Sequence, residues 1–349
     1  MQSHELAADP EQSQSQSQSQ VSSHISLHTL PSGRKLAYHL SGPANGPLLL
    51  LANPLLTNFS LWDPILPTLH AHNYRVLRYD PIGHGSSSPP PPLPRTNTID
   101  DTDTDTSPTT LPTLAADLYH LLTTTLRITT IHAFIGVSLG AATGLYLAVA
   151  HPGLIQRLVA CSVPLCAPIN AGVEDQYAPL VEIARINADA TWILTERTLE
   201  RWFGVEWRGW NAHGHGHERG HRHGEGEMQR LRALMQTTTR EGFIACCNAL
   251  RDRSFDLRPL LGRVAGAVER VMFVAGGADG ELPDVMGWMR EEVVRGFEKE
   301  GKNKKEEDRS EGEIGEKVVE WAVIRGAGHL PMIDHRDRFW KRVLMFLER

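Results

Sequence analysis

The sequence lacks the features that would place it in a membrane, on a nucleic acid or in a disulfide framework. No apolar run approaches the roughly 20 residues that span a bilayer, and the polar N-terminus has no signal-peptide core. It has four cysteines, none in CxxC spacing, which predicts neither disulfides nor a thiolate zinc site. The formal net charge of −6 offers no basic excess for nucleic acid or an anionic membrane surface. We therefore expect a soluble, cytoplasmic protein.

Four segments contain too few apolar residues to repay the entropy of ordering them. Residues 1–24 carry an SQ repeat and predict a disordered tail. The other three look like insertions into a compact domain: the proline- and acid-rich 86–110, the glycine- and histidine-rich 209–227, and the charged 298–317, which predicts a solvated loop.

The second insertion holds five histidines, at positions 213, 215, 217, 221 and 223. Neutral imidazoles bind transition metals, but alternating glycines give them no rigid ligand geometry. A solvated low-complexity loop is the favoured interpretation, and we expect no metal site.

Between these segments, short apolar runs alternate with helix-like stretches. The runs that predict strands are His24–Leu30, Leu36–Leu40, Leu48–Ala52, Arg75–Tyr79, Thr130–Gly136, Arg157–Cys161, Val271–Ala275 and Val318–Ile324. The stretches that predict helices are Leu111–Leu126, Leu139–Ala150, Gln229–Leu250 and Arg338–Leu347. This alternation predicts an α/β fold with a mostly parallel, doubly wound sheet.

The alternation stops over residues 164–263, which are predicted to be helical. We expect this stretch to form a cap on a core made of residues 25–163 and 264–349.

One short stretch, FIGVSLGAATG over residues 134–144, predicts a catalytic serine. It sets Ser138 on a turn between a predicted strand and a predicted helix, which is the setting of a nucleophile elbow. Gly136 and Gly140 leave room for so sharp a turn, and the helix N-terminus can stabilise an oxyanion. The alternative is a glycine-rich turn with a capping serine.

A nucleophilic serine needs a base and an acid that orients the base. In α/β hydrolases they follow in the order serine, acid, histidine. Asp279 comes just after an apolar strand, and His329 lies in a glycine-flanked loop after the last strand. Asp284 could replace Asp279, which we prefer. The two oxyanion donors are expected to be the backbone N–H groups of Leu55 and Leu139.

Several motifs together resemble the α/β-hydrolase superfamily and, within it, the 3-oxoadipate enol-lactonases. In the core these are ANPLLTNFSLWDP, YRVLRYDPIGHGSSS and FIGVSLGAATGLYLAVAHPGLIQRLV. In the cap they are TLERWFG (198–204) and EGFIACCNALRDRSFDLRP (241–259), which are the more specific part. The resemblance covers most of residues 25–349 apart from the insertions.

The resemblance implies an α/β-hydrolase fold and a serine hydrolase that opens a small ester or lactone through an acyl-enzyme, without metal or cofactor. The alternatives are a C–C hydrolase or acyltransferase of the same fold, acting in secondary metabolism, and a catalytically silent binding protein. The sequence leaves the exact substrate and the oligomeric state open.

Four cap or loop residues are candidates for substrate contacts. An enol-lactone diacid would present a carboxylate, and Arg201 and Arg251 are its possible partners by residue type, although solvated surface cations are the commoner case. Trp62 and Trp202 are candidates to line the cavity, although large aromatics more often serve packing. Asp80 is expected to anchor its loop through backbone N–H groups, and His84 to be structural.

Overall fold

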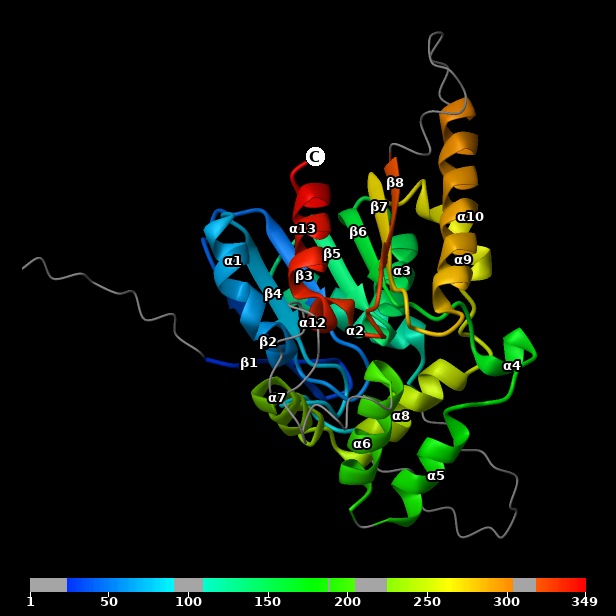
Figure 1. Cartoon of the computed structure of the whole chain (residues 1–349). Helices are drawn as coiled ribbons and strands as arrows, with labels where there is room; N and C mark the ends of the chain where they lie inside the picture. The colour runs from blue at the N-terminus through cyan, green and yellow to red at the C-terminus, as the bar shows by residue number, and fades with distance from the viewer. Residues whose placement is uncertain (1–23, 91–108, 188, 205–224, 304–317) are drawn as a thin grey trace, which may run out of the picture.

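The computed structural model describes residues 24–90, 109–187, 189–204, 225–303 and 318–349. Its centre is an eight-stranded sheet with the strand order β1-β2-β4-β3-β5-β6-β7-β8 (Figure 1). The strands are β1 (Ser26–Thr29), β2 (Lys35–Ser41), β3 (Leu48–Ala52), β4 (Arg75–Tyr79), β5 (Ile131–Val137), β6 (Ile155–Cys161), β7 (Arg270–Gly276) and β8 (Val319–Ile324).

The sheet is parallel except at one edge, where β2 pairs antiparallel with both β1 and β4. Continuous apolar runs such as LLLLA in β3 suit strands that are covered on both faces. All eight predicted strands are confirmed, and so is the mostly parallel sheet.

Helices cover both faces of the sheet. They are α1 (Leu66–Ala71), α2 (Leu111–His120), α3 (Leu139–Ala150), α9 (Arg258–Val264), α10 (Leu282–Asn303) and α13 (Arg336–Leu347). The helices α2, α3, α9 and α10 contact one another in series and form one layer. Figure 1 shows α13 on the opposite face, in front of the sheet. The short helices η1 (Phe59–Ile65), η2 (Leu121–Thr125) and α12 (Pro331–Asp334) lie between these elements in sequence.

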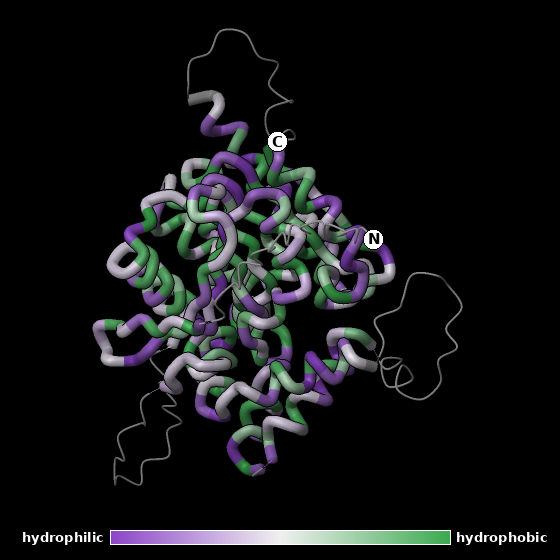
Figure 2. The backbone as a smooth tube through the Cα atoms, turned by 90° about the vertical axis from the view of Figure 1, so that its left-hand side faces the viewer, coloured by the Kyte–Doolittle hydropathy of each residue, from purple (hydrophilic) through white to green (hydrophobic). Residues whose placement is uncertain are grey.

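A helical cap is inserted between β6 and β7. It contains α4 (Pro168–Ala171), α5 (Ala178–Ile186), α6 (Ala190–Phe203), α7 (Glu225–Met235) and α8 (Arg240–Arg251). These helices lie beyond the ends of the strands, as a separate layer at the bottom of Figure 2. The last helix of the predicted cap range, α9, instead packs against α10 and α3 of the core.

The structure corrects the predicted helix Gln229–Leu250, which is two helices. Thr239 caps the second one, α8: its hydroxyl accepts a hydrogen bond from the Gly242 N–H at 3.0 Å. The Thr239 N–H and hydroxyl both donate to the Gly83 carbonyl, so this contact with a core loop fixes the break.

The insertion boundaries are also corrected. Helix α10 was not predicted, and it runs into the charged segment 298–317 as far as Asn303. Met286, Met289 and Val293 form its buried stripe, and extending an existing helix through Glu and Lys residues costs little. At the start of the first insertion, Ser87 is buried, and its hydroxyl donates to the Asp80 carbonyl at 2.6 Å.

Residues 91–108, 209–224 and 304–317 of the insertions, which include the histidine cluster, and residues 1–23 with the SQ repeat lie outside the described residues. None of the helices in the described part of the chain combines the length and apolar content that a membrane span requires.

Candidate active site

Ser138 occupies a strained turn between β5 and α3. Its backbone has φ 53° and ψ −115°, a left-handed conformation that non-glycine residues rarely adopt. Its N–H donates to the Cys161 carbonyl at 2.9 Å, which ties the turn to the neighbouring strand β6. Strain of this kind persists only where the surrounding structure fixes the backbone, and here the sheet does so.

The two flanking glycines are required by close backbone approaches. A β-carbon on Gly136 would lie 2.6 Å from the Ala141 nitrogen in the following helix. A β-carbon on Gly140 would lie 2.5 Å from the Ala52 carbonyl oxygen at the end of β3. The elbow therefore tolerates no β-carbon at either glycine, two positions before and after the serine, as the motif predicted.

His329 and Asp279 come together from the ends of neighbouring strands β8 and β7. The distance from His329 Nδ1 to Asp279 Oδ2 is 2.8 Å, and the two side chains are 4% and 12% exposed. Asp284 lies in the first turn of α10 and is exposed. The structure therefore places the preferred acid, and not the alternative, beside the histidine.

The histidine loop is held by a residue that the sequence analysis missed. The Gly328 N–H donates to Asp334 Oδ2 at 2.6 Å. The pKa of the Asp334 carboxyl is raised to about 7, mainly by burial and to a smaller extent by the nearby Asp279 charge, against the lowering effect of the hydrogen bond from Gly328. The available signal was an acid in an apolar Pro-Met-Ile-Asp turn, five residues after His329.

The cap contacts the same loop. The His329 N–H donates to the Trp202 carbonyl at 2.9 Å, and the two rings stack with centroids 5.7 Å apart and 22° between their planes. A β-carbon on Gly328 would lie 1.9 Å from that carbonyl oxygen. The end of α6 and the histidine loop therefore fit together only because residue 328 is glycine.

The predicted oxyanion loop follows β3, and hydrogen bonds of Asn53 hold it in place. Asn53 accepts a hydrogen bond from Trp62 Nε1 at 2.7 Å and donates to the Tyr79 carbonyl at 3.1 Å. Trp62 is 1% exposed, so the structure corrects the prediction that it contacts substrate. Its indole supports the loop instead.

His84 holds the next part of this loop. The Leu56 N–H donates to His84 Nε2 at 3.0 Å, and His84 Nδ1 lies 2.9 Å from the Ile82 carbonyl, which assigns the proton to Nδ1. Burial lowers the pKa of His84 to about 4, which keeps the ring neutral. Leu56 has φ 67°, so the histidine holds a strained residue directly after Leu55. The prediction that His84 is structural is confirmed.

Asp80 anchors the same region. Its Oδ1 accepts from the Phe59 N–H at 2.6 Å, and its Oδ2 accepts from the Ser86 N–H at 3.1 Å. Burial raises its pKa to about 7, against the lowering effect of these two hydrogen bonds. The prediction that Asp80 binds backbone N–H groups is confirmed.

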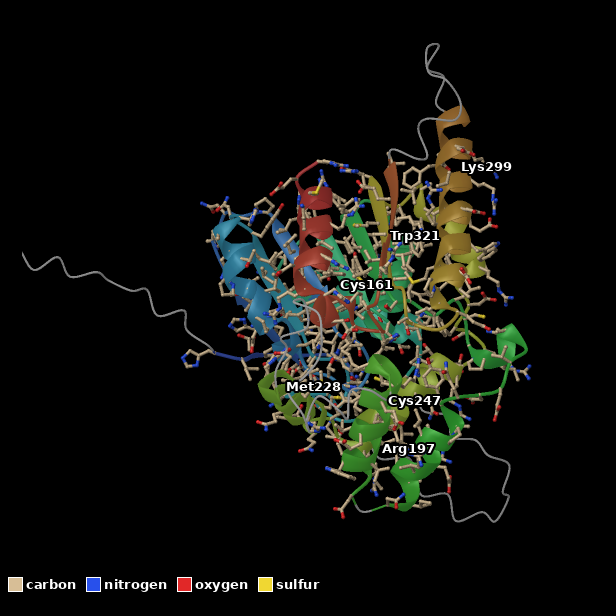
Figure 3. All side chains as sticks on the ribbon, in the orientation of Figure 1. Cys161, Arg197, Met228, Cys247, Lys299 and Trp321 are labelled. Carbon is tan, nitrogen blue, oxygen red and sulfur yellow. The ribbon has the colours of Figure 1, made fainter. Side chains whose placement is uncertain are left out.

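A cavity of about 480 Å³ lies where cap and core meet. The core contributes Leu55, Ser138 and His329 to its lining. The cap contributes Tyr177, Arg197, Glu200, Arg201 and Trp202, among others. Figure 3 shows Arg197 on the cap and Cys161 within the sheet. The volume is typical of a site for a small organic molecule.

The two predicted arginines are placed differently. Arg201 lines the cavity, where it hydrogen-bonds the Tyr177 hydroxyl. Arg251 forms an ion pair with Asp175 and does not line the cavity, so the structure corrects its assignment as a substrate partner. Arg197, one turn before Arg201 on α6, lines the cavity and was not predicted.

Known proteins match this chain in sequence and in structure. The model of the alpha/beta hydrolase fold family matches residues 47–180. The 3-oxoadipate enol-lactonase 1 of Acinetobacter baylyi is 25% identical over 256 residues, which are 73% of this chain and 80% of the relative. A second enol-lactonase of the same organism is 26% identical over 249 residues, which are 69% of this chain and 79% of that relative.

Two solved structures extend the likeness to most of the chain. The crystal structure of a hydrolase from Pseudomonas aeruginosa PA01 superposes with a TM-score of 0.68 at 26% identity, covering 94% of this chain and 100% of that one. The enol-lactonase from Burkholderia xenovorans LB400 superposes with a TM-score of 0.67 at 23% identity, covering 93% and 100%. The chain therefore has the α/β-hydrolase fold, and it is similar in sequence to the 3-oxoadipate enol-lactonases.

Proposed function

We propose that this protein is a serine hydrolase that opens a small ester or lactone through an acyl-enzyme. The observation that carries the proposal is the convergence of Ser138 and His329 on one cavity, with the Asp279 carboxylate 2.8 Å behind the histidine ring. A nucleophile, a base and an orienting acid in this order are what acyl transfer by serine requires.

In the first step, Ser138 Oγ attacks the substrate carbonyl carbon while His329 Nε2 takes the hydroxyl proton. Asp279 Oδ2 accepts a hydrogen bond from the Nδ1–H of His329, which leaves Nε2 free to act as the base and stabilises the imidazolium. His329 then gives the proton to the departing oxygen. In an ester this oxygen leaves with the alcohol, whereas in a lactone it stays on the same molecule.

The negative charge on the tetrahedral oxygen needs donors that are already in place. Leu139 is the first residue of α3, so its N–H is one of the unpaired donors at a helix N-terminus. Leu55 lines the cavity and lies next to the strained, His84-bound Leu56. We assign the two oxyanion donors to these backbone N–H groups.

In the second step, water replaces the alcohol. His329 takes a proton from the water, whose oxygen attacks the acyl carbon, and returns it to Ser138 Oγ as the acid leaves. One water is consumed for each ester or lactone bond, and the enzyme is regenerated. The stacked Trp202 ring covers one face of His329 and shields it from solvent.

For the substrate we propose a small ester or lactone that carries a carboxylate. Two relatives are named 3-oxoadipate enol-lactonases. Two cations of the cap helix α6, Arg197 and Arg201, line the same cavity as Ser138. Guanidinium groups bind carboxylates through paired hydrogen bonds. Arg201, already aligned by Tyr177, is the proposed partner.

Covalent labelling tests the proposal directly. We expect a fluorophosphonate probe to add once to the wild-type chain, at the peptide that contains Ser138, and not to add to Ser138→Ala. Ser254→Ala, which removes an exposed cap serine, is the matched control and should label like the wild type.

Hydrolysis of a panel of small esters and lactones, measured by the release of acid, should also be lost in Ser138→Ala. A folded wild-type chain that takes no label would overturn the proposal in favour of a binding protein. Labelling without turnover of any ester or lactone would point instead to C–C bond hydrolysis or acyl transfer.

A further inference from the structure

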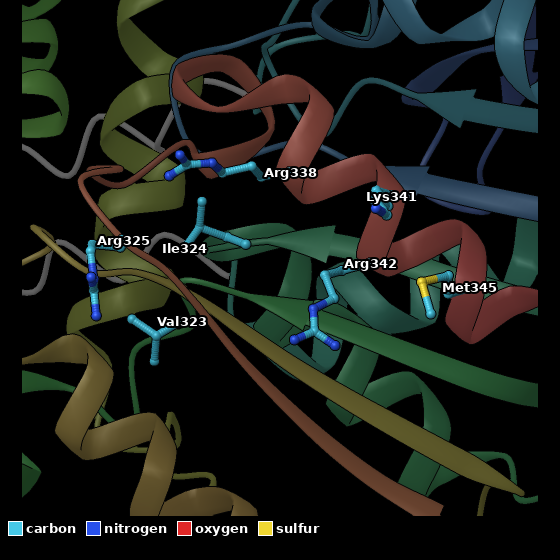
Figure 4. Close-up of a pocket in the computed structure, with 7 residues that line it drawn as sticks. All are labelled: Val323, Ile324, Arg325, Arg338, Lys341, Arg342 and Met345. Atoms are coloured by element: carbon cyan, nitrogen blue, oxygen red, sulfur yellow. The ribbon is translucent and has the colours of Figure 1, made fainter. Parts of the chain in front are cut away.

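A second cavity, of about 600 Å³, lies between the edge of the sheet and α13 (Figure 4). Its lining comes from the end of β8, with Val323, Ile324 and Arg325, and from α13. It shares no lining residue with the cavity at Ser138. Its volume is in the range of sites for small organic ligands.

The helix side of this cavity carries a regular stripe. Arg338, Lys341, Arg342 and Met345 stand at spacings of three and four residues, which places them along one face of α13. The opposite face is buried through residues such as Phe339, Val343 and Phe346. Since the opposite face of α13 packs in the core, this stripe faces the cavity.

The charge of the cavity is of one sign. Arg325, directly after β8, adds a fourth cation to the three on α13, and no acidic residue lines the cavity. Within the described residues, none of the four forms an ion pair; the nearest acid on β8, Glu320, binds Arg270 and Arg349. In a chain with a net charge of −6, four exposed cations around one hollow create a local positive potential that favours an anion.

The floor of the cavity is apolar. Val323 is 45% exposed and Met345 38% exposed, which are high values for such side chains. The aliphatic stems of the arginines and the lysine extend this apolar surface below their charged ends. A bare inorganic ion would leave this surface uncovered, whereas an apolar body attached to the anion would cover it.

We propose that this cavity, named here the β8–α13 site, binds a small soluble phosphate ester whose phosphate is attached to an apolar or aromatic body. The phosphate contacts the guanidinium groups, which match its oxygens in pairs, and the body covers Val323 and Met345. The site is separate from the hydrolytic one and does not depend on the proposed function.

Isothermal titration calorimetry with phenyl phosphate on the full chain tests the proposal. We expect saturable one-to-one binding, roughly tenfold or more tighter than inorganic phosphate, because the phenyl ring buries apolar surface. Affinity should fall as salt is raised, since exposed cations are screened.

Three double variants locate the binding. Lys341→Gln with Arg342→Gln should weaken phenyl phosphate about tenfold; both residues are exposed, and an unchanged melting temperature checks the fold. Arg197→Gln with Arg201→Gln, in the other cavity, should leave binding within about twofold. Arg253→Gln with Arg263→Gln, two exposed surface cations, should do the same.

Each contrary result overturns the proposal. Loss of binding only in the Arg197/Arg201 variant would place the ligand in the hydrolytic cavity. Equal loss in all three variants, or equal affinity for inorganic phosphate, would indicate an adventitious ion only. Binding to phosphatidate-containing phosphatidylcholine vesicles without binding of phenyl phosphate would mean that a lipid surface, and not a soluble ester, is the partner.

Discussion

The core and the cap build the active-site cavity in different ways. Ser138, Asp279 and His329 stand just past the ends of β5, β7 and β8, and a β-carbon at Gly136 or Gly140 would lie under 3 Å from backbone atoms, so the serine turn admits only glycine there. The cap offers long side chains from α6, held by side-chain contacts such as that between Arg201 and Tyr177. In the proposed mechanism, the core therefore positions the reacting groups, and the cap contributes the side chains that would contact the substrate.

The two regions meet at one backbone contact, between the Trp202 carbonyl and the Gly328-His329 segment. This contact links the position of the cap to the position of the base. Variants of the core residues should therefore change mainly kcat, and variants of the cap side chains should change mainly KM.

The largest effect is expected at the orienting acid. Asp279→Asn leaves His329 without its carboxylate and should lower kcat by on the order of 10³–10⁴-fold, with little change in KM. The control is Asp284→Asn, an exposed residue at the start of α10, which should keep kcat within about twofold. Steady-state kinetics on an ester substrate measure kcat and KM for both variants. Equal losses in both variants would remove the distinction between the two acids.

A smaller loss is expected where the cap meets the core. Gly328→Ala adds a β-carbon 1.9 Å from the Trp202 carbonyl oxygen, so the histidine loop or the end of α6 must shift. Displacing the base by about 1 Å should lower kcat/KM by roughly 10²-fold. Gly287→Ala, at a helical glycine with open space around it, is the control and should leave activity unchanged. Normal activity in Gly328→Ala would mean that cap position does not affect the base.

In the cap, the expected effect is on substrate binding. Arg201→Gln should raise KM for a carboxylate-bearing ester by roughly tenfold relative to its neutral methyl ester, with kcat little changed. Arg251→Gln removes a cap arginine that pairs with Asp175 outside the cavity, and it should leave this ratio unchanged. Equal KM changes for the charged and the neutral ester in Arg201→Gln would contradict the proposed carboxylate contact.

The last expected effect concerns stability. Burial raises the pKa of Asp334 from 3.8 to about 7, so between these values the folded state binds a proton that the unfolded state has lost. The free energy of unfolding contributed by this group therefore falls as pH rises from 4 to 7. Asp334→Asn keeps an acceptor for the Gly328 N–H and removes the ionisation.

From pH 5 to pH 8, Asp334→Asn should gain about 2–3 kcal/mol of unfolding free energy relative to the wild type, as linkage to a pKa raised from 3.8 to about 7 implies. Urea unfolding at the two pH values measures it, with Asp284→Asn as the control that should show no such gain. A difference that is flat with pH would show that Asp334 is ionised throughout.

Local patterns predicted much of the core. The apolar runs fixed all eight strands, because strands covered on both faces need continuous apolar residues. The GxSxG spacing predicted the elbow, since only glycine permits the approaches seen at Gly136 and Gly140. Asp80 and His84 were correctly given structural roles from their place after a strand.

The sequence could not sort residues of the same type by their partners. Arg201 faces the cavity and Arg251 binds Asp175, although both lie in the last turn of a cap helix. Trp62 supports Asn53, whereas Trp202 covers His329. Helix α10 escaped prediction because its charged end hides the buried stripe before it.

By itself, then, the sequence determined the strand order along the chain, the strained serine turn and the residues able to serve as base and acid. These depend on backbone conformation and on periodicity, which neighbouring residues specify. Only the tertiary structure decided which acid meets the histidine, which arginine lines the cavity, and that the α13 cations face the end of β8. Such pairings join residues far apart in the chain, and packing alone brings them within reach.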